Sequence, residues 1–199
     1  MPSASAPFGL RPVRGTFGNQ VNPIALPGSL TSGVTANISK GCPVKILTTG
    51  LLSAAAAGDR VFGVFAGCEY DDGSSGKRVI SPSWTASASA TNAIAYVWPA
   101  ENTDFEIQST VVSGGAVITA LTGGCDTSTN NDAANPTTGT RNSTLTLDYS
   151  TLTTTGQFTI MGLAPFPDND FTSDNTYPIF RVRATEPQIG ITQVGVNLA

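Results

Sequence analysis

Carboxylates are the side chains best suited to acid–base chemistry in this sequence, because the 199-residue chain contains no histidine. Two neighbouring carboxylates can act as acid and base in hydrolysis, and the nearest set in the sequence is Asp59, Glu69, Asp71 and Asp72. Nothing in their spacing fixes the separation of any two, and aspartate and glutamate are mostly exposed to solvent. A Ser-His-Asp triad is excluded without histidine. We therefore predict that the protein is not an enzyme and has no catalytic residue.

A second group of acidic residues lies in segments rich in turn-forming residues, where carboxylate oxygens could bind calcium. The group consists of Asp126, Asp132, Asp168, Asp170 and Asp174. The EF-hand pattern fails here, because the glycine at its sixth position and its closing glutamate are missing. Aspartate and asparagine are also ordinary turn residues, since their side chains bond to nearby backbone. Glycine-rich phosphate-binding motifs are absent as well, so we expect neither a metal nor a cofactor.

The three cysteines are widely spaced at Cys42, Cys68 and Cys125, and no CxxC pair exists. A zinc site is therefore not expected. Free cysteine behaves as a small, buried apolar residue, and this is the interpretation we adopt for all three. A disulfide between Cys42 and Cys68 is left open as an alternative.

The charge balance restricts the classes of partner. Charged residues make up 12% of the chain, the formal net charge is −4 and the isoelectric point is about 4.6. Nucleic-acid binding needs clustered Lys and Arg, so no nucleic-acid partner is expected. Apolar stretches such as residues 51–57 fall far short of the roughly 20 residues that cross a bilayer. Residues 1–6 lack a basic region followed by an apolar run, so we expect no signal peptide and no membrane partner.

Hydrophobic patterning predicts strands along most of the chain. Residues 104–108 alternate with the period of two of a half-buried strand, with Phe105 and Ile107 on one face. In the last predicted strand, Arg181 and Arg183 share a face. The only plausible helix is the short apolar run 51–57. The predicted strands are 45–51 with its turn, 61–70 and 77–81 as a hairpin, 93–98, 104–108, 143–149, 157–163 and 179–184.

These elements predict an all-β fold, an antiparallel β-sandwich or barrel with an extended, irregular N-terminal arm and long exposed loops. Residues 1–30 contain five prolines and form the expected arm, and residues 31–199 form a single β-rich domain. Residues 123–142 are rich in Thr, Asn, Asp and Gly and are expected to be a long exposed loop. Six aromatic side chains are expected in the core: Phe62, Phe65, Tyr70, Trp84, Tyr96 and Trp98.

The arm is the segment for which we expect binding. An irregular, proline-rich segment cannot bury its own apolar groups, so it gains by lying on a partner surface, where arginine forks pair with carboxylates. Phenylalanine and arginine are also residues that anchor interfaces. The predicted contact residues are Phe8, Leu10, Arg11, Val13, Arg14 and Phe17.

Short blocks along most of the chain carry a family resemblance. They are the segment Ala6-Pro7-Phe8-Gly9-Leu10-Arg11-Pro12-Val13, then residues 62–70, Trp84, residues 95–97 with Pro99, 105–108, 143–149 and 179–184. In this order they resemble the head decoration, or cement, proteins of tailed bacteriophages. The resemblance implies a structural virion protein on the outer surface of the capsid, which clamps neighbouring subunits of the major capsid protein and stabilises the expanded head. It also implies a homo-oligomer, commonly a trimer.

Two alternatives stay open. One is another virion component, such as a head fibre or a tail or adhesin domain, although the lack of sequence repeats weighs against a long fibre. The other is a carbohydrate-binding β-sandwich module that uses Trp84, Tyr96 and Trp98 as a sugar platform.

Overall fold

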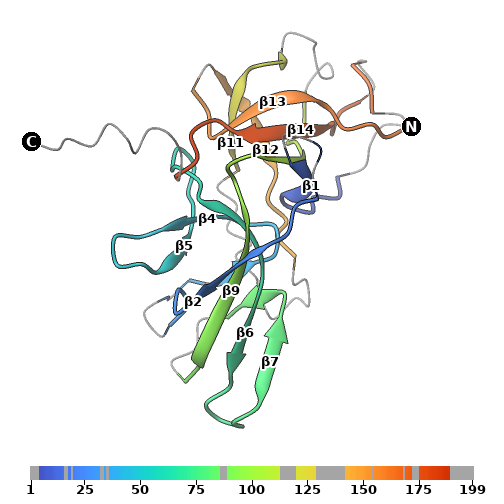
Figure 1. Ribbon diagram of the computed structural model, residues 1–199. Helices are drawn as coiled ribbons and strands as arrows, with labels where there is room; N and C mark the ends of the chain where they lie inside the picture. Colours follow the sequence, from blue (N-terminus) through green and yellow to red (C-terminus); the bar gives the residue numbers. More distant parts are fainter. Residues whose placement is uncertain are drawn as a thin grey trace, which may run out of the picture.

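Fourteen short strands and no α-helix make up the regular structure in the described residues of the computed structural model (Figure 1). The described residues are 5–15, 18, 20–31, 34, 36–85, 89–112, 120–128, 142–153, 155–167, 169–171 and 175–188. The strands are rich in β-branched and aromatic residues, and turns with glycine, asparagine and proline separate them. The fold is all-β, which confirms the predicted class.

The strands form two large sheets and one small one, and all strand pairs within them are antiparallel. Sheet I has the order β1 (Arg11–Gly15), β10 (Thr103–Gln108), β14 (Ile179–Ala184), β13 (Phe158–Leu163), β11 (Gly124–Thr127) and β12 (Leu147–Thr153). Sheet II has the order β2 (Ile24–Pro27), β9 (Thr91–Pro99), β6 (Gly63–Asp71), β4 (Pro43–Ile46) and β5 (Leu52–Ala54), and β7 (Arg78–Ser81) also pairs with β6. Sheet III consists of β3 (Ile38–Ser39) and β8 (Ser83–Trp84). Neither large sheet closes on itself, so the sandwich describes the architecture and the barrel does not.

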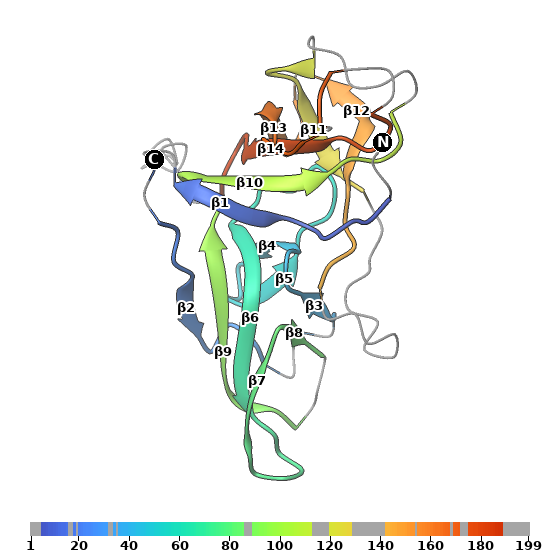
Figure 2. The ribbon, with the colours of Figure 1, turned by 90° about the vertical axis from the view of Figure 1, so that its right-hand side faces the viewer.

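The first core lies between sheets I and II, whose strands run across each other (Figure 2). Sheet I contributes Phe105, Phe158 and Phe180, all fully buried, and Val61 and Val64 meet them from the side of sheet II. Burying a side chain of this size contributes about 1.5–3 kcal/mol. This core therefore fixes which face of sheet I points inward.

The second core covers the other face of sheet II. Phe65, Trp84 and Leu145 are buried in it, and the rings of Tyr70 and Trp84 form a T-shaped pair with centroids 5.4 Å apart. Phe62 is buried there too, which confirms the core prediction for three of the six aromatic residues. The other three, Tyr70, Tyr96 and Trp98, are only partly buried.

Most of the strand predictions hold at the level of whole elements. The hairpin predicted from residues 61–70 and 77–81 forms as β6 and β7, with Cys68 opposite Ser81 and Asp71 opposite Arg78. The strand predicted at 143–149 begins later, because β12 starts at Leu147. The loop predicted at 123–142 is wrong at its start, where Gly124–Thr127 forms β11, and residues 129–141 lie outside the described residues.

The helix expected at residues 51–57 does not form. Leu52–Ala54 is β5 instead, paired with β4 through Val44 opposite Ala54 and Ile46 opposite Leu52. A helix of about seven residues cannot offset its nucleation cost in water, whereas a strand beside β4 gains ladder bonds and buries Leu52.

The irregular arm expected over residues 1–30 is wrong at two stretches, whereas residues 5–10, 20–23 and 28–30 lie outside the strands. Arg11–Gly15 is an edge strand of sheet I, and Ile24–Pro27 is an edge strand of sheet II. The prolines are compatible with these places because an edge strand can lack a ladder donor on its open side. The N-terminal segment therefore joins both sheets.

Two glycines allow the N-terminal segment to lie tightly on the rest of the fold. Gly9 and Gly41 have φ of 71° and 89°, and a Cβ on Gly9 would lie 2.8 Å from the Gly41 carbonyl oxygen. The Leu10 N–H donates to that same oxygen at 2.8 Å, while the Gly41 N–H donates to the carbonyl of Phe65. Backbone meets backbone at this crossing, so a side chain has no room there.

Strand β10 differs from the half-buried strand predicted at 104–108. Phe105 and Ile107 face the first core as expected, but Asp104, Glu106 and Gln108 on the opposite face are buried as well. Buried carboxylates need partners, because an unpaired charge away from water is very costly. The partners define the surface described next.

Candidate interaction surface

Strands β1, β10 and β14 lie side by side in sheet I (Figure 2). The outward face of these strands carries two rows of arginine and carboxylate groups. In one row, Nη2 of Arg11 lies 2.7 Å from Glu106 Oε2 and Nη2 of Arg181 lies 3.7 Å from Glu106 Oε1. In the other, Arg183 contacts Oδ1 of Asp104 through Nε at 2.8 Å and Nη2 at 2.7 Å. We call these five residues, together with Arg14, the arginine face.

A β-bulge brings Arg14 onto this face. Arg11 and Arg14 are three residues apart, so a regular strand would point them to opposite sides. The register shifts between Pro12 and Arg14, which leaves Val13 as the extra residue and sets Arg14 opposite Asp104. Nε of Arg14 then lies 3.5 Å from Asp104 Oδ2.

The carboxylates of the arginine face are buried beneath the arginines. The side chains of Asp104 and Glu106 are 3% and 7% exposed, while Arg11 and Arg14 are each 53% exposed. Four guanidinium groups against two carboxylates leave a formal excess of two positive charges. The solvent therefore meets cations on this face of an acidic protein.

Aromatic rings hold Arg11 in place. Its guanidinium carbon lies 4.9 Å from the ring centre of Phe8 and 5.7 Å from that of Phe166, which is 40% exposed in the β13–β14 connection. Cation–π contacts of this kind contribute about 0.5–1 kcal/mol at exposed sites. Arg11 is thus fixed by a carboxylate and two rings rather than free in solvent.

A groove of about 370 Å³ runs beside Arg11, at the edge of sheet I next to sheet II. The ammonium of Lys40 lies 5.7 Å from the ring centre of Trp98 on its wall. Phe8, Leu10, Arg11, Pro12, Lys40, Gly41, Trp98 and Asn142 line the groove, and none of them is acidic. The groove therefore continues the cationic and aromatic character of the arginine face.

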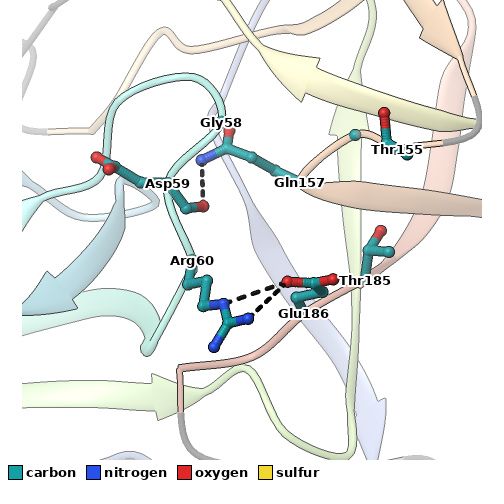
Figure 3. Close-up of a pocket in the computed structure, with 8 residues that line it drawn as sticks. Gly58, Asp59, Arg60, Thr155, Gln157, Thr185 and Glu186 are labelled. Atoms are coloured by element: carbon teal, nitrogen blue, oxygen red, sulfur yellow. Dashed lines mark hydrogen bonds and ion pairs between the residues drawn. The ribbon is translucent and has the colours of Figure 1, made fainter. Parts of the chain in front are cut away.

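A second pocket, of about 310 Å³, lies where the β5–β6 connection meets β13 and β14 (Figure 3). Gln157 donates from Nε2 to the carbonyl oxygens of Ala56 at 2.7 Å and Asp59 at 3.0 Å, and Arg60 pairs with Glu186 at 3.2 Å. These bonds join the two sheets, so the groups that line this pocket serve the packing of the fold.

The carboxylate of Asp59 in this pocket is not suited to donate a proton near neutral pH. Burial raises its pKa, but hydrogen bonds from the Lys45 ammonium at 2.6 Å and the Ala56 N–H at 2.7 Å outweigh it, so the net pKa is lowered. Asp59 is therefore ionised and paired.

The remaining carboxylates of the first predicted set lie on the β6–β7 hairpin. Hydrogen bonds from Arg78 and Tyr96 lower the pKa of Glu69, and bonds from Asn92 and Arg78 lower that of Asp71. Hydroxyl donors from Ser75 and Ser74 at the hairpin turn lower the pKa of Asp72 to about 2. All of them are ionised at neutral pH and engaged in turn or strand contacts.

The three cysteines are buried and free, so the alternative of a Cys42–Cys68 disulfide is wrong. Burial raises the pKa of each thiol to about 12, with Asp148 and Asp126 adding to the effect at Cys125. The thiols are therefore protonated and act as apolar packing groups, as expected.

The predicted contact residues of the N-terminal segment are divided by the fold. Arg11, Val13 and Arg14 are exposed on β1, and Phe8 is half-buried beside Arg11. Leu10 is 1% exposed in the first core, which corrects its place in a contact surface. Phe17 lies outside the described residues.

The sequence also suggested a sugar platform and aspartates that could bind calcium. Trp84 is fully buried in the second core, so the three-residue sugar platform with Tyr96 and Trp98 is wrong. Of the aspartates considered for calcium, Asp126 accepts a hydrogen bond from the Gln157 N–H, while Asp132, Asp168 and Asp174 lie outside the described residues. In the described part of the chain, no group of three His, Cys, Asp or Glu side chains is placed to hold a metal ion.

Sequence reasoning missed the two central residues of the arginine face, Asp104 and Glu106. The available signal was their alternation with Phe105 and Ile107, which places both carboxylates on one face of a strand. Arg181 and Arg183 show the same spacing. Nothing local connects the two strands, because Asp104 and Arg183 are 79 residues apart.

Comparisons with known proteins find no relative. No protein-family model matches the sequence, and neither a curated protein nor a solved structure matches the chain. Within the described residues, no helix has the length and hydrophobicity to span a membrane.

Proposed function

We propose that this chain is a structural virion protein that binds the outer surface of a phage capsid and clamps neighbouring subunits of the major capsid protein. The observation that carries the proposal is the N-terminal segment, which bears the resemblance to head decoration proteins. Its residues Arg11–Gly15 form edge strand β1, on which Arg11, Val13 and Arg14 are exposed.

The proposed clamp acts by linkage. A protein that binds only the closed arrangement of capsid subunits stabilises that arrangement by mass action. In the proposed homo-oligomer, a trimer in the simplest case, each site gains effective concentration from the others, so single contacts can be modest. A rigid edge strand suits this role because little conformational entropy is lost when it binds.

The structure determines which variant can test the proposal. A deletion of the first twenty residues would remove β1 and the core residue Leu10, so its failure to bind would report unfolding. A single substitution at Val13, which is 39% exposed, avoids this. Ile24 provides a matched control, since it is also 39% exposed on an edge strand, but of sheet II.

The purified protein is mixed with expanded capsids that lack it, and co-sedimentation and the temperature of particle rupture are measured. We expect saturable binding and a raised rupture temperature. Val13→Asp should weaken binding about tenfold, the loss of one interface anchor, while Ile24→Asp should stay within about twofold. No binding by the unmodified protein, or equal loss in both variants, would overturn the proposal.

A further inference from the structure

We propose that the arginine face binds a surface of clustered carboxylates on a partner protein. The inference rests on the proposed function in one respect, since it names the chemistry of the capsid surface that the clamp would meet. It depends on the arrangement of Arg11, Arg14, Arg181 and Arg183 around two hidden carboxylates.

The first argument is the separation of charge by depth. Asp104 and Glu106 lie under the arginines and are almost completely inaccessible, so the charges that an approaching partner meets here are positive. Elsewhere the chain is acidic, with 14 Asp and Glu against 10 Lys and Arg overall. The arginine face is therefore a cationic patch on an anionic molecule, and complementary charge steers a partner to this side.

The second argument is that donors remain available on groups that are already oriented. A guanidinium carries five N–H donors. The hydrogen bonds among the described residues use one donor of Arg11 and the contacts to Asp104 use two nitrogens of Arg183. Arg11 and Arg14, which are each 53% exposed, therefore present further donors to the solvent. Arginine side chains fixed in this way can donate hydrogen bonds to a partner's carboxylate and lose little further conformational entropy.

The third argument is the composition around the arginines. Val13, Met161 and Phe166 are 39%, 47% and 40% exposed, and they lie on or next to the strands of the arginine face. Arginine, methionine and phenylalanine are enriched in protein interfaces, whereas exposed Asp and Glu are depleted. Here the acidic side chains are buried and the apolar ones are exposed, which is the reverse of an ordinary solvated sheet face.

The same observations favour a protein partner over a nucleic acid. Phosphate backbones are bound by extended cationic tracks that release many counterions. The arginine face has an excess of only two positive charges, which is too few for such a track. Short-range pairing with carboxylates needs no such track.

The test measures binding of the full chain to three probes at low salt: capsids that lack the protein, a poly-L-glutamate peptide, and a DNA duplex of equal charge. The variant is Arg11→Gln with Arg14→Gln. The control is Arg60→Gln, because Arg60 is similarly exposed, at 51%, in an ion pair with Glu186 in the pocket of Figure 3. Unfolding curves of each variant establish that it is folded.

We expect the double variant to bind poly-L-glutamate about tenfold more weakly, with less than about a twofold change in the control, as for two exposed charge contacts. Arg11→Lys with Arg14→Lys keeps the pairing to Glu106 and Asp104 and should lose an intermediate amount, since lysine lacks the fork. This second variant decides the question if the glutamine variant does not fold.

The outcomes separate the two proposals. Binding to poly-L-glutamate that depends on Arg11 and Arg14, without binding to capsids, would support the arginine face and overturn the capsid function. Tighter binding to DNA than to poly-L-glutamate would overturn the inference. So would equal binding by the double variant and its control, or a loss of self-association confined to the double variant, which would make the face a contact between copies.

Discussion

Arginine and carboxylate groups cluster at two places in the described part of the chain, and their proportions are opposite. On sheet I, one carboxylate is held by two arginines, as Asp104 is by Arg14 and Arg183. On the β6–β7 hairpin, one arginine bridges two carboxylates, since Arg78 lies 3.1 Å from Glu69 and 3.0 Å from Asp71. The same kind of ion pair therefore leaves an excess of positive charge on sheet I and an excess of negative charge on the β6–β7 hairpin.

Burial also distinguishes the two clusters. The Asp104 side chain is 3% exposed, while those of Glu69 and Asp71 are 22% and 34% exposed. Ion pairs in water contribute little to stability, whereas removing one partner of a buried pair leaves a charge without solvent or counterion. The comparison teaches that depth, and not the number of contacts, decides which pairs the fold depends on.

The largest expected loss of stability follows from removing the buried carboxylate of Asp104. Asp104→Ala should destabilise the protein by about 3 kcal/mol, because two arginines lose their shared partner in a partly buried site. Urea unfolding monitored by tryptophan fluorescence measures the change. Asp71→Ala is the matched control and should have a far smaller effect. Similar losses in the two variants would show that depth does not separate the clusters.

The next largest expected loss of stability comes from Gly9, which lies just before strand β1. Gly9→Ala should destabilise by about 2 kcal/mol, since alanine must adopt φ of 71° and its Cβ would press on the Gly41 carbonyl. Gly50→Ala measures the backbone part alone, because Gly50 has φ of 81° with nothing within 4 Å of the added Cβ, and should cost about 1 kcal/mol. If both variants lose the same stability, the crossing at Gly41 is not tight.

The smallest expected effect is a pH dependence of stability that comes from Asp72 on the β6–β7 hairpin. The folded-state pKa of Asp72 is lowered to about 2 by bonds from Ser75 and Ser74, so its contribution to stability is present above its ordinary pKa and is lost as the pH falls through about 2. Asp72→Asn removes this dependence. The difference in urea midpoint between the two proteins should shrink as the pH is lowered from about 4 to about 2. A difference that is constant over this range would contradict the assignment.

The sequence predicted the elements whose evidence is local. Apolar runs and turn residues located β6, β7, β9, β13 and β14. Alternation located β10, because the residues of one strand face repeat every two positions. The helix predicted at residues 51–57 is wrong because a run of small apolar residues fits a helix or a strand equally well. Only pairing with the neighbouring strand β4 decides between them.

The candidate surface was predictable only in part, for a physical reason. The sequence predicts Arg11 and Arg14 as contact residues, and both are exposed on β1. Their partners could not be found, because Arg11 and Glu106 are 95 residues apart and the bulge at Val13 breaks the alternation that would have placed Arg14. Long-range pairing and register shifts leave no local trace in a single sequence.

The order of strands in sheet I has a consequence for biosynthesis. Its neighbours β1, β10 and β14 come from residues 11–15, 103–108 and 179–184, whereas sheet II draws only on residues 24–99. On a ribosome that releases the chain from its N-terminus, sheet II can therefore form while β1 still has no partner. Asp104 and Glu106 can meet Arg14 and Arg11 once β10 emerges, but their pairing with Arg183 and Arg181 waits for β14. The arginine face is therefore completed among the last parts of the fold.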